Sequence, residues 1–301
     1  MSAIGLIGLG SWGRRCADTL SRLPEASLAA VHDISARTLE GFRVGADVQK
    51  TADIDEFLAA SALTSVVIAA PTPCHLGLAL RALEAGLDVL VEKPMTETGS
   101  QALELVEAAE SLGKVLAVGH IMLYHPSFRE LRKAVDSGAH GPVDHIESVR
   151  TSSGLPDSDV LGDLACHDIA MAIALKGRPV AARASEAGDD RHAASFELMF
   201  TDETLLCGHV AWTDAQPVRR FDLRCSRGTV SLDQGTPEGT GFRDTPLARQ
   251  CLDFLRCCAT RRTPVSAASL GVEVMLSLDA LRESIESGSR WVTTEQPAAV
   301  S

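Results

Sequence analysis

The chain has 301 residues, of which 45% are hydrophobic and 23% are charged, and its formal net charge is −12. This composition is typical of a soluble globular protein with one large or two ordinary domains. The acidic balance disfavours nucleic acid as a partner, and no apolar run approaches the roughly 20 residues of a membrane span. Because no signal peptide precedes the first apolar segment, we expect a cytoplasmic protein. The eight cysteines show neither a CxxC pair nor zinc-finger spacing, so we expect reduced thiols and no metal site.

A glycine-rich turn follows the first predicted strand, residues 3–7. It has the G-x-G-x-x-G pattern, and we expect a helix to open after it at Arg14. Gly8 allows a tight turn, Gly10 lets the backbone approach a pyrophosphate, and Gly13 lets the helix pack close to the strand. The helix N-terminus adds N–H groups and the positive end of its dipole. The residues that we assign to this phosphate site are Gly8, Gly10, Ser11, Trp12 and Gly13.

An acidic residue ends the second predicted strand, residues 28–32. Asp33 lies 20 residues beyond Gly13, where a carboxylate accepts hydrogen bonds from the adenosine ribose. Its charge would repel a 2′-phosphate, so we favour NAD over NADP as the cofactor. Arg37 is kept as a cofactor contact because a cation there could pair with a 2′-phosphate. The alternative for Asp33 is a capping role before a helix that begins near Ser35.

A proline-rich turn ends the next strand, residues 65–70. It reads Pro-Thr-Pro-Cys-His from residue 71 to residue 75. Such a rigid loop could press against a flat ring like nicotinamide, so we assign Pro71 and Thr72 to the cofactor site. His75 is included as a candidate contact, although a structural role at the start of the next helix is favoured.

The buried strand at residues 89–91 ends in Glu92, Lys93 and Pro94. In an open α/β sheet, ligands bind at the carboxyl ends of the strands. Lys93 could therefore transfer a proton, the alternative being a solvated charge. We place Glu92 and Lys93 among the cofactor contacts, and Glu92 could also brace Lys93. Because strands and helices alternate up to about residue 120, residues 1–120 are predicted to form a Rossmann domain with a doubly wound parallel sheet.

Residues 121–301 are predicted to form a second, α+β domain. Short strands between residues 181 and 232 predict an open, largely antiparallel sheet. Two C-terminal helices, residues 247–260 and 269–288, are expected to pack back on the first domain.

The predicted helix 160–175 carries two polar residues, Asp163 and His167, on one face. A carboxylate one turn from an imidazole can orient the ring and raise its basicity. The alternative is an ordinary exposed pair of helical side chains, which would contribute a few tenths of a kcal/mol to helix stability.

Taken together, these motifs resemble the Gfo/Idh/MocA family, named after glucose-fructose oxidoreductase, inositol dehydrogenase and a rhizopine catabolism protein. The resemblance rests on the glycine-rich loop, the proline-rich turn with its histidine, the segment from Ala85 to Pro94 and Val118-Gly-His. It implies a proton-transfer group of Lys93, Asp163 and His167, all of which would also contact substrate. Further substrate contacts implied by the resemblance are His120 and Tyr124.

The resemblance also suggests a function. Residues 119–131 and 159–168 are similar to family members that oxidise the 3-hydroxyl of nucleotide-activated sugars. We expect His167 or Lys93 to accept the hydroxyl proton while a hydride leaves for the nicotinamide. The alternatives are a dehydrogenase of free sugars or cyclitols and a non-catalytic NAD(H)-binding sensor or scaffold. A homodimer or homotetramer joined through the second-domain sheet is expected from the resemblance.

Overall fold

A computed structural model of the protein describes residues 2–60, 63–153, 159–186, 192–213, 216–232 and 241–295. The chain forms two compact units. Unit 1 comprises Met1–Glu97, Gln101–Gly119 and Gly241–Ser269, and unit 2 comprises Thr98–Ser100, His120–Thr240 and Leu270–Ser301. Parts of the loops predicted at residues 152–158 and 234–245 lie outside the described residues.

Unit 1 contains a parallel six-stranded sheet in the order β3-β2-β1-β4-β5-β6. Its strands are β1 (Ser2–Ile7), β2 (Ala26–His32), β3 (Gln49–Thr51), β4 (Ser65–Ile68), β5 (Asp88–Val91) and β6 (Leu116–Val118). Every residue of β4, β5 and β6 is buried, as expected for parallel strands covered on both faces. The predicted doubly wound sheet is therefore confirmed. The short strand β3 was not predicted, because Gln-Lys-Thr carries no apolar side chain.

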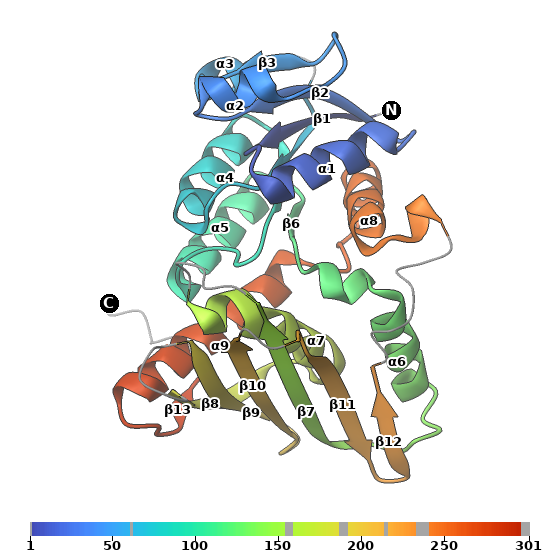
Figure 1. Ribbon diagram of the computed structural model, residues 1–301, viewed down its shortest axis with the longest axis vertical. Helices are drawn as coiled ribbons and strands as arrows, with labels where there is room; N and C mark the ends of the chain where they lie inside the picture. The colour runs from blue at the N-terminus through green and yellow to red at the C-terminus, as the bar shows by residue number, and fades with distance from the viewer. Residues whose placement is uncertain are drawn as a thin grey trace. The chain divides into compact units, whose positions relative to one another are not determined.

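Helices cover both faces of this sheet (Figure 1). They are α1 (Ser11–Arg22), α2 (Ala36–Gly41), α3 (Ile54–Leu58), α4 (His75–Glu84), α5 (Gly99–Ser111) and α8 (Pro246–Thr260), with 3₁₀ turns η1 (Thr72–Cys74) and η4 (Phe242–Asp244). Figure 1 shows α4 and α5 on the opposite side of the sheet from α1 and α8. Residues of α1 and α8 share one buried apolar cluster, which includes Cys16, Leu20, Cys251 and Phe254.

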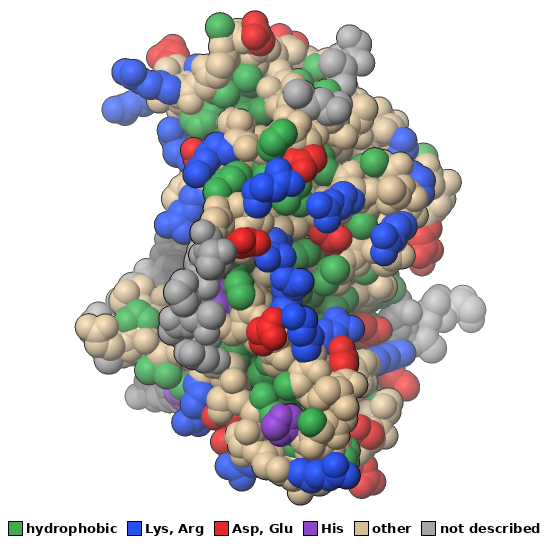
Figure 2. All heavy atoms as spheres, turned by 90° about the vertical axis from the view of Figure 1, so that its right-hand side faces the viewer, with side chains coloured by type: hydrophobic (Ala, Val, Ile, Leu, Met, Phe, Trp, Pro, Cys, Tyr) green, Lys and Arg blue, Asp and Glu red, His purple; other side chains and the backbone are tan. Residues whose placement is uncertain are grey.

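Charged contacts attach residues 242–243, which precede α8, to the C-terminal end of α1. Arg243 pairs with Glu25, and the guanidinium of Arg22 lies 3.8 Å from the ring centroid of Phe242. These groups are largely exposed, so water and salt screen the contacts and each adds little to stability. In unit 1, Figure 2 shows Lys and Arg side chains interleaved with Asp and Glu over α8. In unit 2, charges of both signs likewise lie over the helix α6 (Pro126–Asp136).

Unit 2 contains a seven-stranded sheet in the order β12-β11-β7-β10-β9-β8-β13. Its strands are β7 (Val143–Ser152), β8 (Pro179–Glu186), β9 (Ala193–Phe200), β10 (Leu205–Trp212), β11 (Arg219–Cys225), β12 (Gly228–Ser231) and β13 (Val292–Thr293). Strands β7 and β10 pair in parallel, and the other neighbours pair antiparallel. The largely antiparallel sheet is thus confirmed.

The helices of unit 2 gather on one face of this sheet, where Figure 1 shows α7 and α9. They are α6, α7 (Cys166–Lys176) and α9 (Ala268–Glu286), with a 3₁₀ turn η2 (Ile121–Tyr124) and a π-helical turn η3 (Leu161–Ala165). The helix predicted over residues 160–175 is therefore present in two parts, η3 and α7. Of the two C-terminal helices that we expect against the first domain, α8 lies in unit 1, whereas α9 lies in unit 2 from Leu270 onward.

Two kinds of feature are absent from the described ranges. No helix there combines the length and apolarity of a transmembrane segment. No three His, Cys, Asp or Glu side chains there converge in a way that could hold a metal ion.

Candidate functional site

The glycine-rich loop of unit 1 is shaped by close backbone contacts at two of its glycines. Gly8 has φ +93°, and a Cβ there would lie 2.6 Å from Ala69 O. A Cβ on Gly13 would collide with the carbonyl group of Gly8. A Cβ on Gly10 would meet no atom of the described chain within 4 Å. The fold itself therefore requires Gly8 and Gly13, whereas the bare backbone at Gly10 is open to an external group.

The helix after this loop starts earlier than we predicted. Its first residue is Ser11, with Gly10 as N-cap, instead of Arg14. The N–H of Arg14 makes the first helical bond, to Gly10 O at 3.0 Å, which leaves the amides of the first turn directed out of the helix. In α1, all of which the structure describes, the first turn holds no acidic side chain. The loop thus combines amide donors with a positive dipole end, which suits a phosphate.

Asp33 ties the glycine-rich loop to the end of β2. Its Oδ2 accepts a hydrogen bond from Leu9 N at 2.8 Å, and its Oδ1 accepts one from Ser35 N at 2.9 Å. The N-cap of α2 is Ser35, whose Oγ accepts from Thr38 N at 3.2 Å, so Asp33 is not the cap. Each carboxylate oxygen keeps capacity for another donor, such as a ribose hydroxyl.

Ile34 is a candidate contact that the sequence reasoning missed. Its side chain is 88% exposed, directly after Asp33 at the carboxyl end of the sheet. An apolar side chain left in water beside the predicted ribose site is suited to pack on a flat base. The available signal was an isoleucine outside the apolar pattern of β2. Arg37, one helical turn further on, is exposed.

His75 links two loops at the carboxyl ends of β4 and β5. The ring is 1% exposed, with Nδ1 2.8 Å from Pro94 O and Nε2 2.8 Å from Ala70 O. Burial lowers the pKa of His75, although the backbone carbonyls oppose that shift. Because both ring nitrogens face main-chain oxygens, the imidazole offers no atom to a cofactor. These contacts are those of the structural role that the sequence favoured, while Pro71 is exposed and Thr72 is partly exposed in the same loop.

Glu92 and Lys93 follow β5 in different environments. Glu92 N donates to Ile68 O at 2.9 Å and continues the sheet, and its carboxyl is buried, with the residue 7% exposed. Lys93 is partly exposed. The Glu92 carboxyl therefore makes its contacts inside unit 1, and the cofactor contact that we expected of it stays a prediction. Lys93 N lies 3.3 Å from Glu92 Oε2, and the Lys93–Pro94 peptide is cis.

The remaining predicted residues lie in unit 2. Asp163 lies in the π-helical turn η3 and His167 in the first turn of α7, both partly exposed, while the residues between them are buried. They therefore share the outward side of this helix. Single π-helical turns occur often at functional sites. His120 is the N-cap of η2 and Tyr124 is its last residue, and both are buried, at 1% and 5% exposure.

Neighbouring groups fix the start and the core side of this helix. Asp159 Oδ1 accepts from Leu161 N at 3.0 Å, and Arg282 Nε donates to Asp159 Oδ2 at 3.0 Å. On the core side, Asp168 forms a buried ion pair with Arg150 of β7, with Oδ1 2.6 Å from Nη2 and 3.1 Å from Nε. The outward residues Asp163 and His167 are therefore carried by an anchored segment.

The structure thus gathers the predicted cofactor residues at one edge of one sheet. The glycine-rich loop, Asp33, the loop after β4 and Lys93 follow four parallel strands, whose carboxyl ends share an edge. That edge offers amide donors, a carboxylate and an ammonium group, which fit a dinucleotide.

Two family models match the chain. One, described as an oxidoreductase family with an NAD-binding Rossmann fold, matches residues 2–120. The other, described as the GFO/IDH/MocA C-terminal domain, matches residues 128–231. Together they cover more than half of the chain.

The similar proteins include dehydrogenases that are named for two kinds of substrate. UDP-N-acetylglucosamine 3-dehydrogenase of Acidithiobacillus ferrooxidans is 28% identical over 94% of this chain and 96% of its own length. Its solved structure has a TM-score of 0.84 at 25% identity, covering 95% of this chain and 98% of that one. Inositol 2-dehydrogenase of Rubrobacter xylanophilus is 37% identical, but over only 46% of this chain and 41% of that enzyme.

A further solved structure shows the shared fold. Scyllo-inositol dehydrogenase of Lactobacillus casei, with bound NAD(H) and scyllo-inositol, has a TM-score of 0.88 at 17% identity. The alignment covers 98% of this chain and 99% of that one.

Proposed function

The chain belongs to the Gfo/Idh/MocA family of NAD-binding oxidoreductases, and we propose that it oxidises the 3-position of a nucleotide-activated sugar. The matched relatives are dehydrogenases that act on CH–OH groups of sugars and cyclitols. The observation that carries the choice of substrate is the likeness to UDP-N-acetylglucosamine 3-dehydrogenase, which extends over 94% of this chain. The inositol dehydrogenase match covers less than half of it.

We propose NAD as the cofactor in preference to NADP. The amides of the α1 N-terminus and the open backbone at Gly10 suit the pyrophosphate, and Asp33 suits an unphosphorylated ribose. Ile34 and Arg37 flank this position. Arg37 would favour NADP only if its cation outweighed the repulsion between Asp33 and a 2′-phosphate.

Three side chains carry the proposed chemistry. When bound, the nicotinamide accepts the hydride. Lys93 holds the substrate hydroxyl through its ammonium group and stabilises the oxygen as its proton leaves. His167 accepts that proton, and Asp163 orients the imidazole and stabilises its charged form. All three are partly exposed, Lys93 just after β5 and Asp163 and His167 on η3 and α7, which supports these roles.

Two other functions compete with this one. A free-sugar or cyclitol dehydrogenase would use the same chemistry, and the likeness to inositol dehydrogenases favours it as the second candidate. A non-catalytic NAD(H)-binding sensor would have no need for Lys93, Asp163 and His167 together.

A substrate panel separates these functions. Formation of NADH would be followed with UDP-sugars, free sugars and inositols, for the native protein and Lys93→Met. We expect turnover with a UDP-sugar, and its loss in Lys93→Met with NAD affinity nearly unchanged. Turnover of only an inositol or a free sugar would select the second candidate. NAD binding without turnover of any member of the panel would support the sensor.

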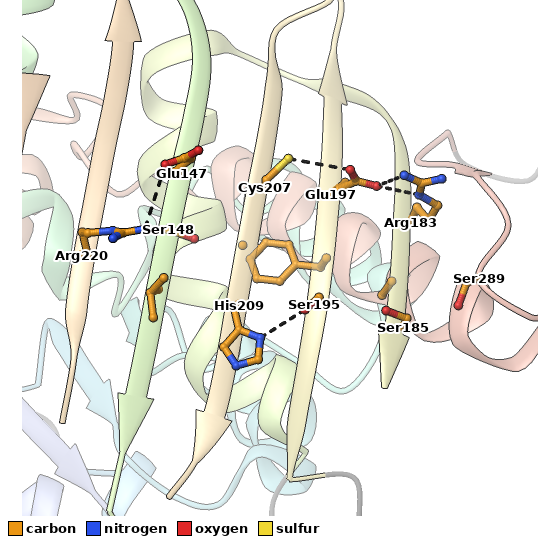
Figure 3. Close-up of a pocket in the computed structure, with 14 residues that line it drawn as sticks. Glu147, Ser148, Arg183, Ser185, Ser195, Glu197, Cys207, His209, Arg220 and Ser289 are labelled. Carbon is orange, nitrogen blue, oxygen red and sulfur yellow. Dashed lines mark hydrogen bonds and ion pairs between the residues drawn. The ribbon is translucent and has the colours of Figure 1, made fainter. Parts of the chain in front are cut away.

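We further infer that the protein is a homo-oligomer joined through the open face of the unit 2 sheet. This face holds a pocket of about 510 Å³, with helices behind the sheet (Figure 3). A cross-strand row of side chains of both signs lies on it, which is suited to pair with a second copy. The row comprises Arg183, Glu197, Cys207, Glu147 and Asp222.

Sedimentation tests this assembly. Ser195 lies exposed in the pocket, 3.1 Å from His209 Nδ1 through its Oγ, so Ser195→Trp would obstruct a partner. We expect the native protein to sediment as a dimer or larger and the variant to shift toward the monomer. A native monomer would refute the inference.

A further inference from the structure

Glu92 places a carboxyl group inside the core of unit 1, directly before Lys93. Burial raises the pKa of Glu92, and Trp12, Lys93 and Gln250 oppose that shift. Burial also raises the pKa of the Cys16 and Cys251 thiols, and the negative charge of Glu92 adds to both shifts. The carboxyl therefore faces α1, which carries Trp12 and Cys16, and α8, which carries Gln250 and Cys251.

A glycine makes room for this carboxyl at the end of β6. A Cβ on Gly119 would lie 2.8 Å from Glu92 Oε1 and closer still to Oε2 and Cδ. Gly119 N donates to Val91 O at 2.7 Å, so the backbone at Gly119 is fixed beside the end of β5. The carboxyl consequently lies against the main chain of Gly119, and a larger residue there would displace it.

The Glu92 carboxyl and its polar neighbours are buried without well-formed hydrogen bonds. Within the described residues, Glu92 Oε1, Trp12 Nε1 and both polar atoms of the Gln250 amide make no hydrogen bond of standard geometry, although Trp12 and Gln250 lie close enough to the carboxyl to lower its pKa through weak hydrogen bonds. A buried polar atom whose hydrogen bond is missing costs about 1–3 kcal/mol of folding free energy, of which a weak bond recovers only part, and Gln250 is 1% exposed. Apolar side chains in place of Trp12, Glu92 and Gln250 would stabilise the core more, so the polar groups at these positions indicate a functional role.

We propose that Glu92 is a positioning residue for Lys93, held in place by Gly119, Trp12 and Gln250. Its Oε2 receives the N–H of Lys93, and its neighbour Trp12 lies in the turn that faces the cofactor phosphates. One carboxyl thus joins the phosphate-binding turn, α8 and the backbone of the residue that meets substrate. This inference rests on the proposed function, in which Lys93 holds the reacting hydroxyl.

A double-mutant cycle between Glu92 and Gly119 tests the proposal. Misplacing a reacting group by about 1 Å costs about 100-fold in rate, so we expect Glu92→Ala to lower kcat by about that factor. Gly119→Ala should displace the carboxyl and lower kcat similarly. The double variant should be no slower than either single one, because the added methyl group occupies the space that the carboxyl leaves. Glu92→Gln, which keeps the shape and the acceptor oxygen, should retain most of kcat.

Two further measurements distinguish positioning of Lys93 from a purely structural role of Glu92. KM for substrate and the dissociation constant for NAD should change by less than about threefold while kcat falls. Tryptophan fluorescence during NAD titration should show a Trp12 response in the native protein that Glu92→Ala weakens and Glu92→Gln keeps, with Trp12→Phe identifying the signal. Glu84→Ala, an exposed acid on α4, is the control that should change nothing.

The outcomes separate this inference from the function on which it rests. If Lys93→Met keeps full turnover, the proposed function fails first. If Lys93→Met is inactive but Glu92→Ala keeps native kcat, only the positioning role fails. The positioning role would also be overturned if the kcat losses of the two single variants multiplied in the double variant. A kcat that falls only in proportion to the melting temperature would overturn it as well.

Discussion

At the scale of single residues, the end of β5 gives two neighbours opposite tasks. Glu92 continues the sheet ladder and has its carboxyl in the core, whereas Lys93 is partly exposed. His75 holds the same segment from the other side through Pro94 O. The proposed substrate lysine is therefore fixed by main-chain and side-chain contacts on both flanks, which is how a reacting group is kept in place.

Asp33 provides a test of cofactor choice at this scale. Asp33→Asn removes the charge that would repel a 2′-phosphate and weakens the hydrogen bonds to Leu9 N and to the ribose. Because hydrogen bonds to a charged group contribute about 1.5–3 kcal/mol, NAD affinity should fall roughly 10- to 100-fold. NADP affinity should fall less or rise. Titration of both cofactors measures this, with Glu40→Gln on α2 as an exposed-acid control. An unchanged NAD/NADP ratio would remove Asp33 from cofactor recognition.

His75 predicts how stability depends on pH. Burial lowers the pKa of His75, so the unfolded chain binds a proton there more readily than the folded protein. The unfolded histidine titrates near about pH 6.5, and the free energy of unfolding should therefore fall as the pH drops below that value. His75→Gln cannot titrate, so its stability should depend less on pH in this range. Urea midpoints at several pH values would show this, and His192→Gln, at an exposed position, should keep the native slope.

At the scale of elements, the helical segment that carries Asp163 and His167 is held by a buried ion pair, whose two charges lose their hydration on folding. Arg150 and Asp168 are 5% and 0% exposed and form an ion pair between β7 and α7. Burial raises the pKa of Asp168, and the charge of Arg150 opposes that shift. Buried pairs of this kind add little net stability, but removing one partner is costly. We propose that the pair fixes the position of α7 against the sheet, and with it the side on which His167 lies.

Breaking this ion pair should strongly lower the free energy of unfolding. Asp168→Asn leaves Arg150 buried without its counter-charge, so the free energy of unfolding should fall by about 3–5 kcal/mol. Replacing both residues with apolar ones of similar volume should recover most of that loss. Urea unfolding measures the effect, with Arg132→Met as the control, because its pair with Asp136 is largely exposed and worth about 1 kcal/mol or less. A loss for Asp168→Asn no larger than the control would contradict the anchoring role.

The elements show why part of the fold could be predicted from the sequence. Strands β4 and β5 are continuous apolar runs with clear boundaries, so their burial was evident. The early start of α1 could not be predicted, because Ser11, Trp12 and Gly13 are ordinary loop residues whose helical conformation depends on the packing of Gly13 against Gly8. The π-helical turn likewise has no local sequence signal.

The candidate site, like the fold, could be predicted from the sequence only in part. The edge that holds the glycine-rich loop, Asp33 and Lys93 follows from strand order, which the alternating pattern predicts. The contacts of Glu92 with Gly119 and Gln250 join segments far apart in the chain, and pairing of that kind leaves no local pattern in one sequence. For the same reason, Asp168 gave no hint that its partner was Arg150.

At the scale of the whole molecule, unit 1 is completed by a distant segment. Six buried residues of α8 belong to the apolar cluster beneath β1 and β2, namely Ala248, Cys251, Leu252, Phe254, Leu255 and Cys257. Residues 1–120 alone would therefore expose the apolar side of α1 and leave Glu92 without Gln250. The strands of unit 1 come from one continuous stretch of the chain, but its core also needs α8 from a distant stretch.

A fragment comparison tests this dependence. Residues 1–120 alone should unfold without cooperativity or aggregate, because exposing several large apolar side chains costs about 1.5–3 kcal/mol each. The same fragment joined to residues 241–269 by a flexible linker should unfold cooperatively. Circular dichroism during thermal unfolding distinguishes the two. A cooperative transition in residues 1–120 alone would show that α8 is dispensable.

The most direct test of the whole account follows one hydrogen atom. The native protein would be incubated with NAD and a UDP-sugar that carries deuterium on carbon 3, and the reduced cofactor would be analysed by mass spectrometry. We predict that the reduced cofactor gains one deuterium and that its formation is abolished in Lys93→Met. Reduction of NAD without deuterium, or no reduction with any UDP-sugar, would contradict the proposed hydride transfer from the 3-position.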